Sequence, residues 1–193
     1  TSEERIIWKY NFYKKRFKKH FFKINLTIEL NNLIVSDNLG YLYSIDLESG
    51  KLIWAKNYGI PFRSNIKTDD EYLFLINQDN KFYIIQKSNG EKKIDIETFP
   101  SFLKNNHQAS ISIDPIKKNV YFITTAGEVY SLNYKTKVIN WLYKTTLRDF
   151  EKKVDLFFSS PIIYKEDSII VSTSVSTISL NTLNGTLNWE LPF

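Results

Sequence analysis

The sequence contains no cysteine and no methionine, and it has only two histidines. Without cysteine the chain has no disulfides, no thiol nucleophile and no thiolate metal ligand. The histidines, His20 and His107, lie far apart and lack the short ligand spacing of a metal-binding motif. These absences argue against thiol chemistry and against a histidine-based metal site.

Long apolar runs are also missing. No stretch approaches the roughly 18 consecutive apolar residues that a membrane-spanning helix needs, and the first residues lack the pattern of a signal peptide. Because the chain begins with Thr1 and has no methionine, we interpret it as a mature chain or an excised piece. Hydrophobic residues make up 42% of the sequence and aromatic residues 16%, a composition that excludes a disordered chain.

The sequence does contain an internal repeat. The stretch "SIDLESGKLIW" at 44–54 recurs as "SLNYKTKVINW" at 131–141 and as "SLNTLNGTLNW" at 179–189. A weaker copy at 84–94 ends on isoleucine, and the opening "RIIWKY" resembles the tail of a further copy. All the tryptophans therefore hold one repeat position: Trp8, Trp54, Trp141 and Trp189. Repetition at intervals of about 40 to 50 residues is typical of propellers and other repeat folds.

Each copy is preceded by two further short apolar segments separated by turn residues, so that one unit reads as four antiparallel strands in about 45 residues. This size and content predict a propeller blade. We therefore predict an all-β fold, a partial β-propeller of about four four-stranded antiparallel blades within a single repeat domain, 1–193. The expected blades are approximately 24–58, 61–98, 108–145 and 156–193, with an orphan outer strand of a preceding blade at 5–12.

Glycines and tryptophans have assigned structural roles in this prediction. Gly50, Gly90 and Gly185 fall in the turns between the third and fourth strands, where glycine adopts a positive φ without steric cost. Each tryptophan near the end of an outer strand is expected to fill the wedge toward the next blade, with its N–H on a backbone carbonyl. Ile94 replaces tryptophan in the second unit, so that junction should be looser or filled by another group.

These residues carry a family resemblance. The stretch at 44–54 resembles the tryptophan-docking repeat of pyrroloquinoline-quinone-type propellers, written A-x-D-x-x-T-G-x-x-x-W, and keeps Asp46, Gly50 and Trp54. The copy at 131–141 keeps the tryptophan but has Lys137 in place of the glycine. The resemblance covers nearly the whole chain.

Within that family the chain is most similar to the BamB-like proteins, non-enzymatic propellers of the outer-membrane protein assembly machinery in Gram-negative bacteria. The resemblance implies a protein-binding scaffold with a BamA-like partner, in the periplasm and associated with the outer membrane. It also implies about eight blades, of which this chain holds half a ring. We expect the isolated chain to self-associate or to behave as a marginally stable fragment.

Two other classes stay open as alternatives. Quinone-dependent dehydrogenases of this fold bring a vicinal cysteine pair, an aspartate base and calcium ligands together, and this sequence has no cysteine. We therefore predict no enzyme, and no catalytic, cofactor-binding or metal-binding residue. Asp69, Asp70 and Asp114 lie in expected turns, where aspartate caps the turn for structural reasons. A sensor or adhesion propeller is the other alternative.

One basic segment supplies the whole positive excess of the chain. Residues 9–23, "KYNFYKKRFKKHFFK", hold seven of the 26 basic residues and no acidic residue. The favoured interpretation is a solvated connection whose aromatic residues pack on the sheet. Contact with an anionic membrane surface or polyanion is the first alternative, and nucleic acid, which we do not expect, is the second. The residues of this basic patch are Lys14, Lys15, Arg16, Lys18 and Lys19.

The connection "NYGIPFRSN" at 57–65 is the candidate partner-binding loop. Loops on a rigid propeller carry function more often than its strands, and an arginine beside an exposed aromatic residue is a typical interface pair. BamB-like proteins are similar in binding BamA through interblade loops with Arg, Leu and Asp side chains. On that resemblance, the candidate partner contacts are Phe62, Arg63 and Asp155.

Overall fold

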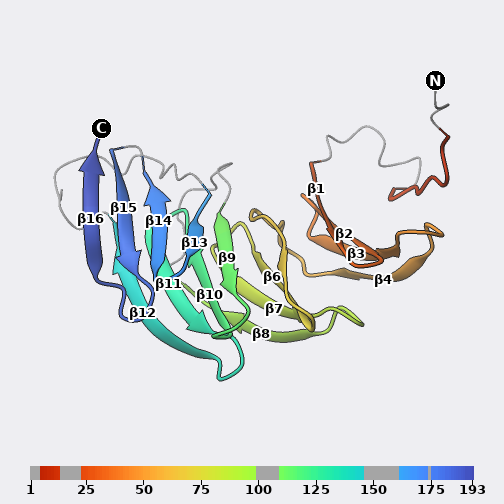
Figure 1. Cartoon of the computed structure of the whole chain (residues 1–193). Helices are drawn as coiled ribbons and strands as arrows, with labels where there is room; N and C mark the ends of the chain where they lie inside the picture. The colour runs from red at the N-terminus through yellow and green to blue at the C-terminus, as the bar shows by residue number, and fades with distance from the viewer. Residues whose placement is uncertain (1–4, 14–22, 99–108, 146–160, 174) are drawn as a thin grey trace.

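The computed structural model of the chain describes residues 5–13, 23–98, 109–145, 161–173 and 175–193 (Figure 1). These residues form four antiparallel four-stranded sheets and contain no helix. Strand order within each sheet follows the chain, so every sheet is a simple up-and-down meander. The predicted all-β partial propeller of four blades is therefore confirmed.

The sheets are named blades 1 to 4 in chain order. Blade 1 consists of β1 (Ile24–Glu29), β2 (Asn32–Asp37), β3 (Tyr41–Asp46) and β4 (Leu52–Asn57). Blade 2 consists of β5 (Lys67–Thr68), β6 (Tyr72–Ile76), β7 (Phe82–Gln86) and β8 (Lys92–Ile96). Blade 3 consists of β9 (Ser110–Asp114), β10 (Asn119–Ile123), β11 (Glu128–Asn133) and β12 (Val138–Lys144). Blade 4 consists of β13 (Ile163–Lys165), β14 (Ser168–Ser172), β15 (Ser176–Asn181) and β16 (Leu187–Pro192).

The repeat seen in the sequence is also a repeat in strand register. The third and fourth strands of the blades pair Ser44 with Trp54, Ile84 with Ile94, Ser131 with Trp141, and Ser179 with Trp189. In every blade the register shifts immediately after this pair, which marks a β-bulge. The bulge therefore changes the direction of the outer strand at the same position in each repeat.

The segment expected as an orphan outer strand at 5–12 is not assigned as a strand. Residues 5–13 are not paired in any of the four described sheets. The segment instead lies against blade 1, where Trp8, Tyr10 and Phe12 pack on the buried cluster of Val35, Tyr43 and Ile45. It covers part of that face by side-chain contacts alone.

Buried clusters join each blade to the next. One cluster contains Ile34 and Leu42 of blade 1 with Leu73, Tyr83 and other residues of blade 2. A second joins blades 2 and 3, and a third joins blades 3 and 4. In Figure 1 the four sheets follow one another across the molecule in chain order. The core thus lies between successive sheets, as burial of both faces of a blade requires.

Three tryptophans dock on the following blade by the same contacts. The indole Nε1 of Trp8 donates to the carbonyl oxygen of Leu47 at 2.8 Å, Trp54 donates to Lys87 at 2.9 Å, and Trp141 donates to Thr182 at 2.9 Å. In each case the carbonyl belongs to the residue that directly follows the third strand of the blade. Each ring lies over a turn glycine, and a Cβ added to Gly50, Gly90 or Gly185 would come within 2.6 Å of it.

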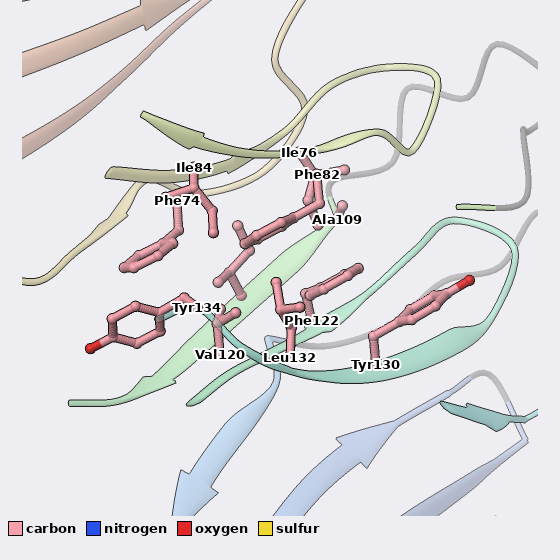
Figure 2. Close-up of a cluster of buried hydrophobic side chains, with 11 residues drawn as sticks. Phe74, Ile76, Phe82, Ile84, Ala109, Val120, Phe122, Tyr130, Leu132 and Tyr134 are labelled. Atoms are coloured by element: carbon pink, nitrogen blue, oxygen red, sulfur yellow. The ribbon is translucent and has the colours of Figure 1, made fainter. Parts of the chain in front are cut away.

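The junction between blades 2 and 3 lacks this pair. Ile94 and Lys137 hold the tryptophan and glycine positions, and Tyr134, 2% exposed, fills the space with its ring 4.9 Å from that of Phe74. Figure 2 shows Phe74 and Phe82 of blade 2 facing Phe122 and Tyr134 of blade 3. The junction is therefore filled by aromatic side chains from several strands.

Candidate functional site

The candidate site is the last residue of β4 together with the connection between β4 and β5, residues 57–66, here called the Arg63 loop. Of the connections between blades, this one lies wholly within the described residues. Its start is fixed by hydrogen bonds from Tyr58 N to Gly40 O at 2.8 Å and from Gly59 N to Asn57 Oδ1 at 2.7 Å. Gly59 has φ +84° and stands in open space. The chain therefore turns sharply at Gly59 before it enters blade 2.

Phe62 is buried, contrary to the expectation that it is exposed. Its side chain is 2% exposed, and its ring lies 5.5 Å from that of Tyr58 and 5.7 Å from that of Tyr83. The loop folds inward because these three rings complete the cluster between blades 1 and 2. Phe62 therefore positions the loop and presents no surface to a partner.

Tyr58 ties the loop to the neighbouring turn. Its hydroxyl donates to the carbonyl oxygen of Gly90 at 2.6 Å, in the same turn that receives the ring of Trp54. Burial raises the pKa of the Tyr58 hydroxyl well above its ordinary value, so the group is neutral at physiological pH. The loop is therefore held against blade 2 by a hydrogen bond as well as by its aromatic residues.

Arg63 has a fixed backbone and a partly paired guanidinium group. Its N–H donates to Ile76 O at 2.8 Å, and its Nη2 donates to Gln78 Oε1 at 3.4 Å. Its Nε is buried and has no hydrogen-bond partner among the described residues. Gln78 is itself held, because its N–H donates to Pro61 O at 2.8 Å. The Arg63 side chain as a whole is half-buried, and a guanidinium on a fixed loop is suited to a carboxylate or carbonyl acceptor.

Sequence reasoning missed the two polar residues that anchor the end of the loop. Ser64 Oγ accepts from Ile76 N at 2.8 Å, and the Asn65 side chain both accepts from Ile111 N at 3.1 Å and donates to Ile111 O at 3.4 Å. Asn65 therefore connects the loop directly to β9 of blade 3. The sequence signal, a serine and an asparagine after Arg63, reads as an ordinary turn.

The remaining predicted partner contact and the basic patch lie outside the described residues. This applies to Asp155 and to Lys14, Lys15, Arg16, Lys18 and Lys19. At the start of the basic segment, Phe12 packs edge-on against Tyr43 with ring centroids 5.1 Å apart, and the Tyr13 hydroxyl donates to Asp37 Oδ2 at 2.6 Å. Burial, reinforced by Asp37, raises the pKa of Tyr13. Aromatic residues at this end of the segment thus pack on blade 1.

Two of the acidic residues noted in the sequence, Asp69 and Asp114, cap turns. Asp69 Oδ1 accepts from the backbone N–H groups of Glu71 and Tyr72, at 2.9 and 2.6 Å. Asp114 Oδ1 accepts from Ile116 N and Lys117 N, both at 3.0 Å. Within the described ranges, no group of three or more His, Cys, Asp or Glu side chains is placed to bind a metal ion. None of the described residues forms a helix long and apolar enough to cross a membrane.

The four blades, the repeated strand register and the docked tryptophans define a partial propeller of pyrroloquinoline-quinone-type repeats. Residues 3–193 match the family described as outer membrane protein assembly factor BamB, and the chain belongs to that family. The sequence matches no curated protein.

Two solved structures have a similar fold. BamB from Moraxella catarrhalis has a TM-score of 0.65 and 15% identity over 86% of this chain and 47% of the other chain. The computationally designed Ika8 protein has a TM-score of 0.67 and 9% identity over 86% of this chain and 48% of the other chain. The chain thus spans about half the length of both proteins.

Proposed function

We propose that the chain is a non-enzymatic protein-binding scaffold that takes part in outer-membrane protein assembly, in the periplasm and with a BamA-like partner. The family match over residues 3–193 is the observation that supports this proposal most strongly. A rigid array of blades with a loop anchored to three of them suits binding, because a preorganised loop loses little conformational entropy on contact.

The Arg63 guanidinium is the proposed contact with that partner, with Asp155 as a second contact by family resemblance. Arginine is enriched at interface positions that dominate binding, and its planar group recognises carboxylates by two parallel hydrogen bonds. The Arg63 side chain is half-buried on a loop whose backbone is held by hydrogen bonds, which supports this assignment. The chemistry expected on the partner is an exposed aspartate or glutamate, or a free edge of backbone carbonyls.

Titration calorimetry of the 193-residue chain with the water-soluble part of a BamA-type protein tests the proposal. We expect saturable binding, and a loss of affinity of about tenfold in Arg63→Gln because a buried charged hydrogen bond is removed. Lys51→Gln is the matched control, since Lys51 is exposed at the opposite end of β4 from the loop. It should bind like the wild type.

Two results would contradict the proposal. One is wild-type affinity in Arg63→Gln, which would remove Arg63 from the interface. The other is tight stoichiometric binding of pyrroloquinoline quinone and calcium in equilibrium dialysis, which would favour the dehydrogenase alternative over the scaffold.

A further inference from the structure

The sequence Asn-Gly occurs at two places in the chain, and both lie in turns between the third and fourth strands of a blade. Asn89–Gly90 lies between β7 and β8, and Asn184–Gly185 lies between β15 and β16. Asparagine before glycine loses its side-chain amide readily, because glycine has no Cβ to keep its backbone nitrogen away from the asparagine side chain. Both asparagines are exposed, so water reaches them. Each turn is therefore a candidate for spontaneous modification.

The reaction is a cyclisation of the chain on itself. The backbone nitrogen of the glycine attacks the side-chain carbon Cγ of the asparagine, its proton goes to hydroxide or a buffer base, and the side-chain amide leaves as ammonia. Water then opens the succinimide ring at one of its two carbonyl carbons, which gives aspartate or β-linked isoaspartate. The attack turns the carbonyl oxygen Oδ1 into an oxyanion. Hydrogen-bond donors already placed on Oδ1 therefore speed the reaction.

The two turns share the contacts that oppose this reaction. The N–H of Gly90 donates to Gln86 O at 2.8 Å. The N–H of Gly185 donates in the same way to Asn181 O at 2.9 Å, so the attacking nitrogen is occupied in both turns. A docked tryptophan ring also lies over each glycine. These contacts slow both sites and do not distinguish them.

The two turns differ in the donors on the asparagine Oδ1. Asn184 Oδ1 accepts from Thr186 N at 3.1 Å and from Thr186 Oγ1 at 2.8 Å. Asn89 Oδ1 accepts from Glu91 N at 2.8 Å, and the side chain of Glu91 has no hydroxyl to donate. A hydroxyl that donates to Oδ1 binds more strongly once that oxygen is charged. Asn184 is therefore the more strongly activated of the two.

The two turns also differ in how the glycine is held. The hydroxyl of Tyr58 donates to Gly90 O at 2.6 Å, which ties that turn to blade 1. Thr145 is the repeat equivalent of Tyr58, because both follow an outer strand and donate their N–H to a turn glycine of the same blade. The hydroxyl of Thr145 donates to Gly127 O at 2.8 Å, within its own blade. It therefore does not hold the turn of blade 4.

We propose that Asn184 is a site of spontaneous deamidation in the folded chain, that the Thr186 hydroxyl promotes this reaction, and that Asn89 is modified more slowly. The product replaces an amide by a carboxylate and, in isoaspartate, lengthens the backbone directly before the glycine on which Trp141 docks. Modification should therefore loosen the junction between blades 3 and 4. This inference is independent of the proposed binding function.

Peptide mapping by mass spectrometry tests the proposal. The purified chain is incubated in a mildly alkaline buffer, and the aspartate and isoaspartate formed at each asparagine are followed over time. Incubation in urea gives the rates of the same two sites in the unfolded chain, which corrects for their different neighbouring residues. Relative to this reference, we expect Asn184 to be modified at least about fivefold faster than Asn89, the effect of one ordinary hydrogen bond.

Variants of the two turns separate the causes. Thr186→Val removes the hydroxyl and should slow the reaction of Asn184 about fivefold, whereas Thr186→Ser keeps the hydroxyl and should react like the wild type. Tyr58→Phe removes the tie on the other turn and should speed the reaction of Asn89 about fivefold. In every variant the second asparagine is the internal control, because a general loosening of the fold would speed both sites.

Three outcomes overturn the proposal. Equal rates at the two asparagines, relative to the unfolded reference, would show that the fold does not select Asn184. An unchanged rate in Thr186→Val would remove the hydroxyl from the reaction. A Thr186→Ser variant that reacts as slowly as Thr186→Val would assign the effect to the methyl group of the threonine.

Discussion

The junction between blades 3 and 4 and the junction between blades 2 and 3 bury their cores in different ways. The first places Trp141 over Gly185, and the second has Ile94 and Lys137 at those positions and is filled by Tyr134. Lys137 has φ +66°, close to the +71° of Gly185. A side chain is therefore tolerated in this turn conformation. The glycine is required because the indole ring leaves no space for a Cβ.

Removing Trp141, the docked tryptophan of the junction between blades 3 and 4, should have the largest effect on stability. Trp141→Ala should lower the free energy of unfolding by about 3–5 kcal/mol, because a buried ring and its hydrogen bond to Thr182 are lost. Urea unfolding at low protein concentration measures this. Trp189→Ala, at an exposed position, should cost less than about 1 kcal/mol. Equal losses in the two variants would contradict the docking account.

The glycine beneath the ring is the next largest effect. Gly185→Ala should cost about 2–5 kcal/mol, because the Cβ overlaps the ring of Trp141 and the positive φ disfavours alanine. Gly59→Ala separates the two causes, since Gly59 has φ +84° and nothing within 4 Å. It should cost only the backbone contribution of about 1–2 kcal/mol. A similar cost at both sites would mean that φ alone selects glycine.

The junction between blades 2 and 3, which has no tryptophan, can be changed toward the tryptophan–glycine arrangement of the junction between blades 3 and 4. Ile94→Trp should destabilise the chain by about 1–3 kcal/mol, because Tyr134 and the side chain of Lys137 restrict the space. In the background of Lys137→Gly the same change should cost about 1 kcal/mol less, as expected for two residues in contact. Strict additivity of the two changes in chemical denaturation would argue against a shared site.

An ion pair adds a smaller contribution at the same junction. Lys135 Nζ lies 2.7 Å from Glu71 Oε2 and 5.0 Å from the centre of the Tyr72 ring, so it links blades 3 and 2. The hydrogen bond from Lys135 lowers the pKa of Glu71 below its ordinary value of 4.5. Because the pKa of Glu71 is lower in the folded state, the ion pair stabilises the fold at pH values above the pKa of the unfolded chain. This stability is lost as the pH falls below about 4.5.

Glu71→Gln should therefore flatten the dependence of the melting temperature on pH in that acidic range. Near neutral pH the slope of this dependence should be the same as in the wild type. Calorimetric scans of wild type and variant between these conditions measure the effect. An unchanged slope would show that the pair is screened by solvent.

The blades could be predicted because the sequence repeats the same residue pattern once per blade. Tryptophan at one register position, and glycine or asparagine in the turns, is a local pattern that survives without any knowledge of contacts. The segment at 5–12, predicted as an orphan outer strand, pairs with no described strand, and its sequence does not show whether a neighbouring strand is present.

The candidate site was less accessible to sequence reasoning. The Arg63 loop was located by its glycine, proline and arginine, but the burial of Phe62 depends on Tyr83, a residue of another strand. The hydrogen bonds between Asn65 and Ile111 join residues that are 46 positions apart in the sequence. The filling of the second junction by Tyr134 likewise depends on packing between blades, which no local pattern encodes.

The central claim, that a ring from one blade dictates glycine in the next, is tested most directly by a double-mutant cycle on Trp141 and Gly185. The free energy of unfolding is measured by urea denaturation for the wild type, both single variants and the double variant. In the Trp141→Ala background, Gly185→Ala should lose its steric cost and retain only the backbone cost, giving a coupling of at least about 1 kcal/mol. The same cost for Gly185→Ala in both backgrounds would contradict the claim.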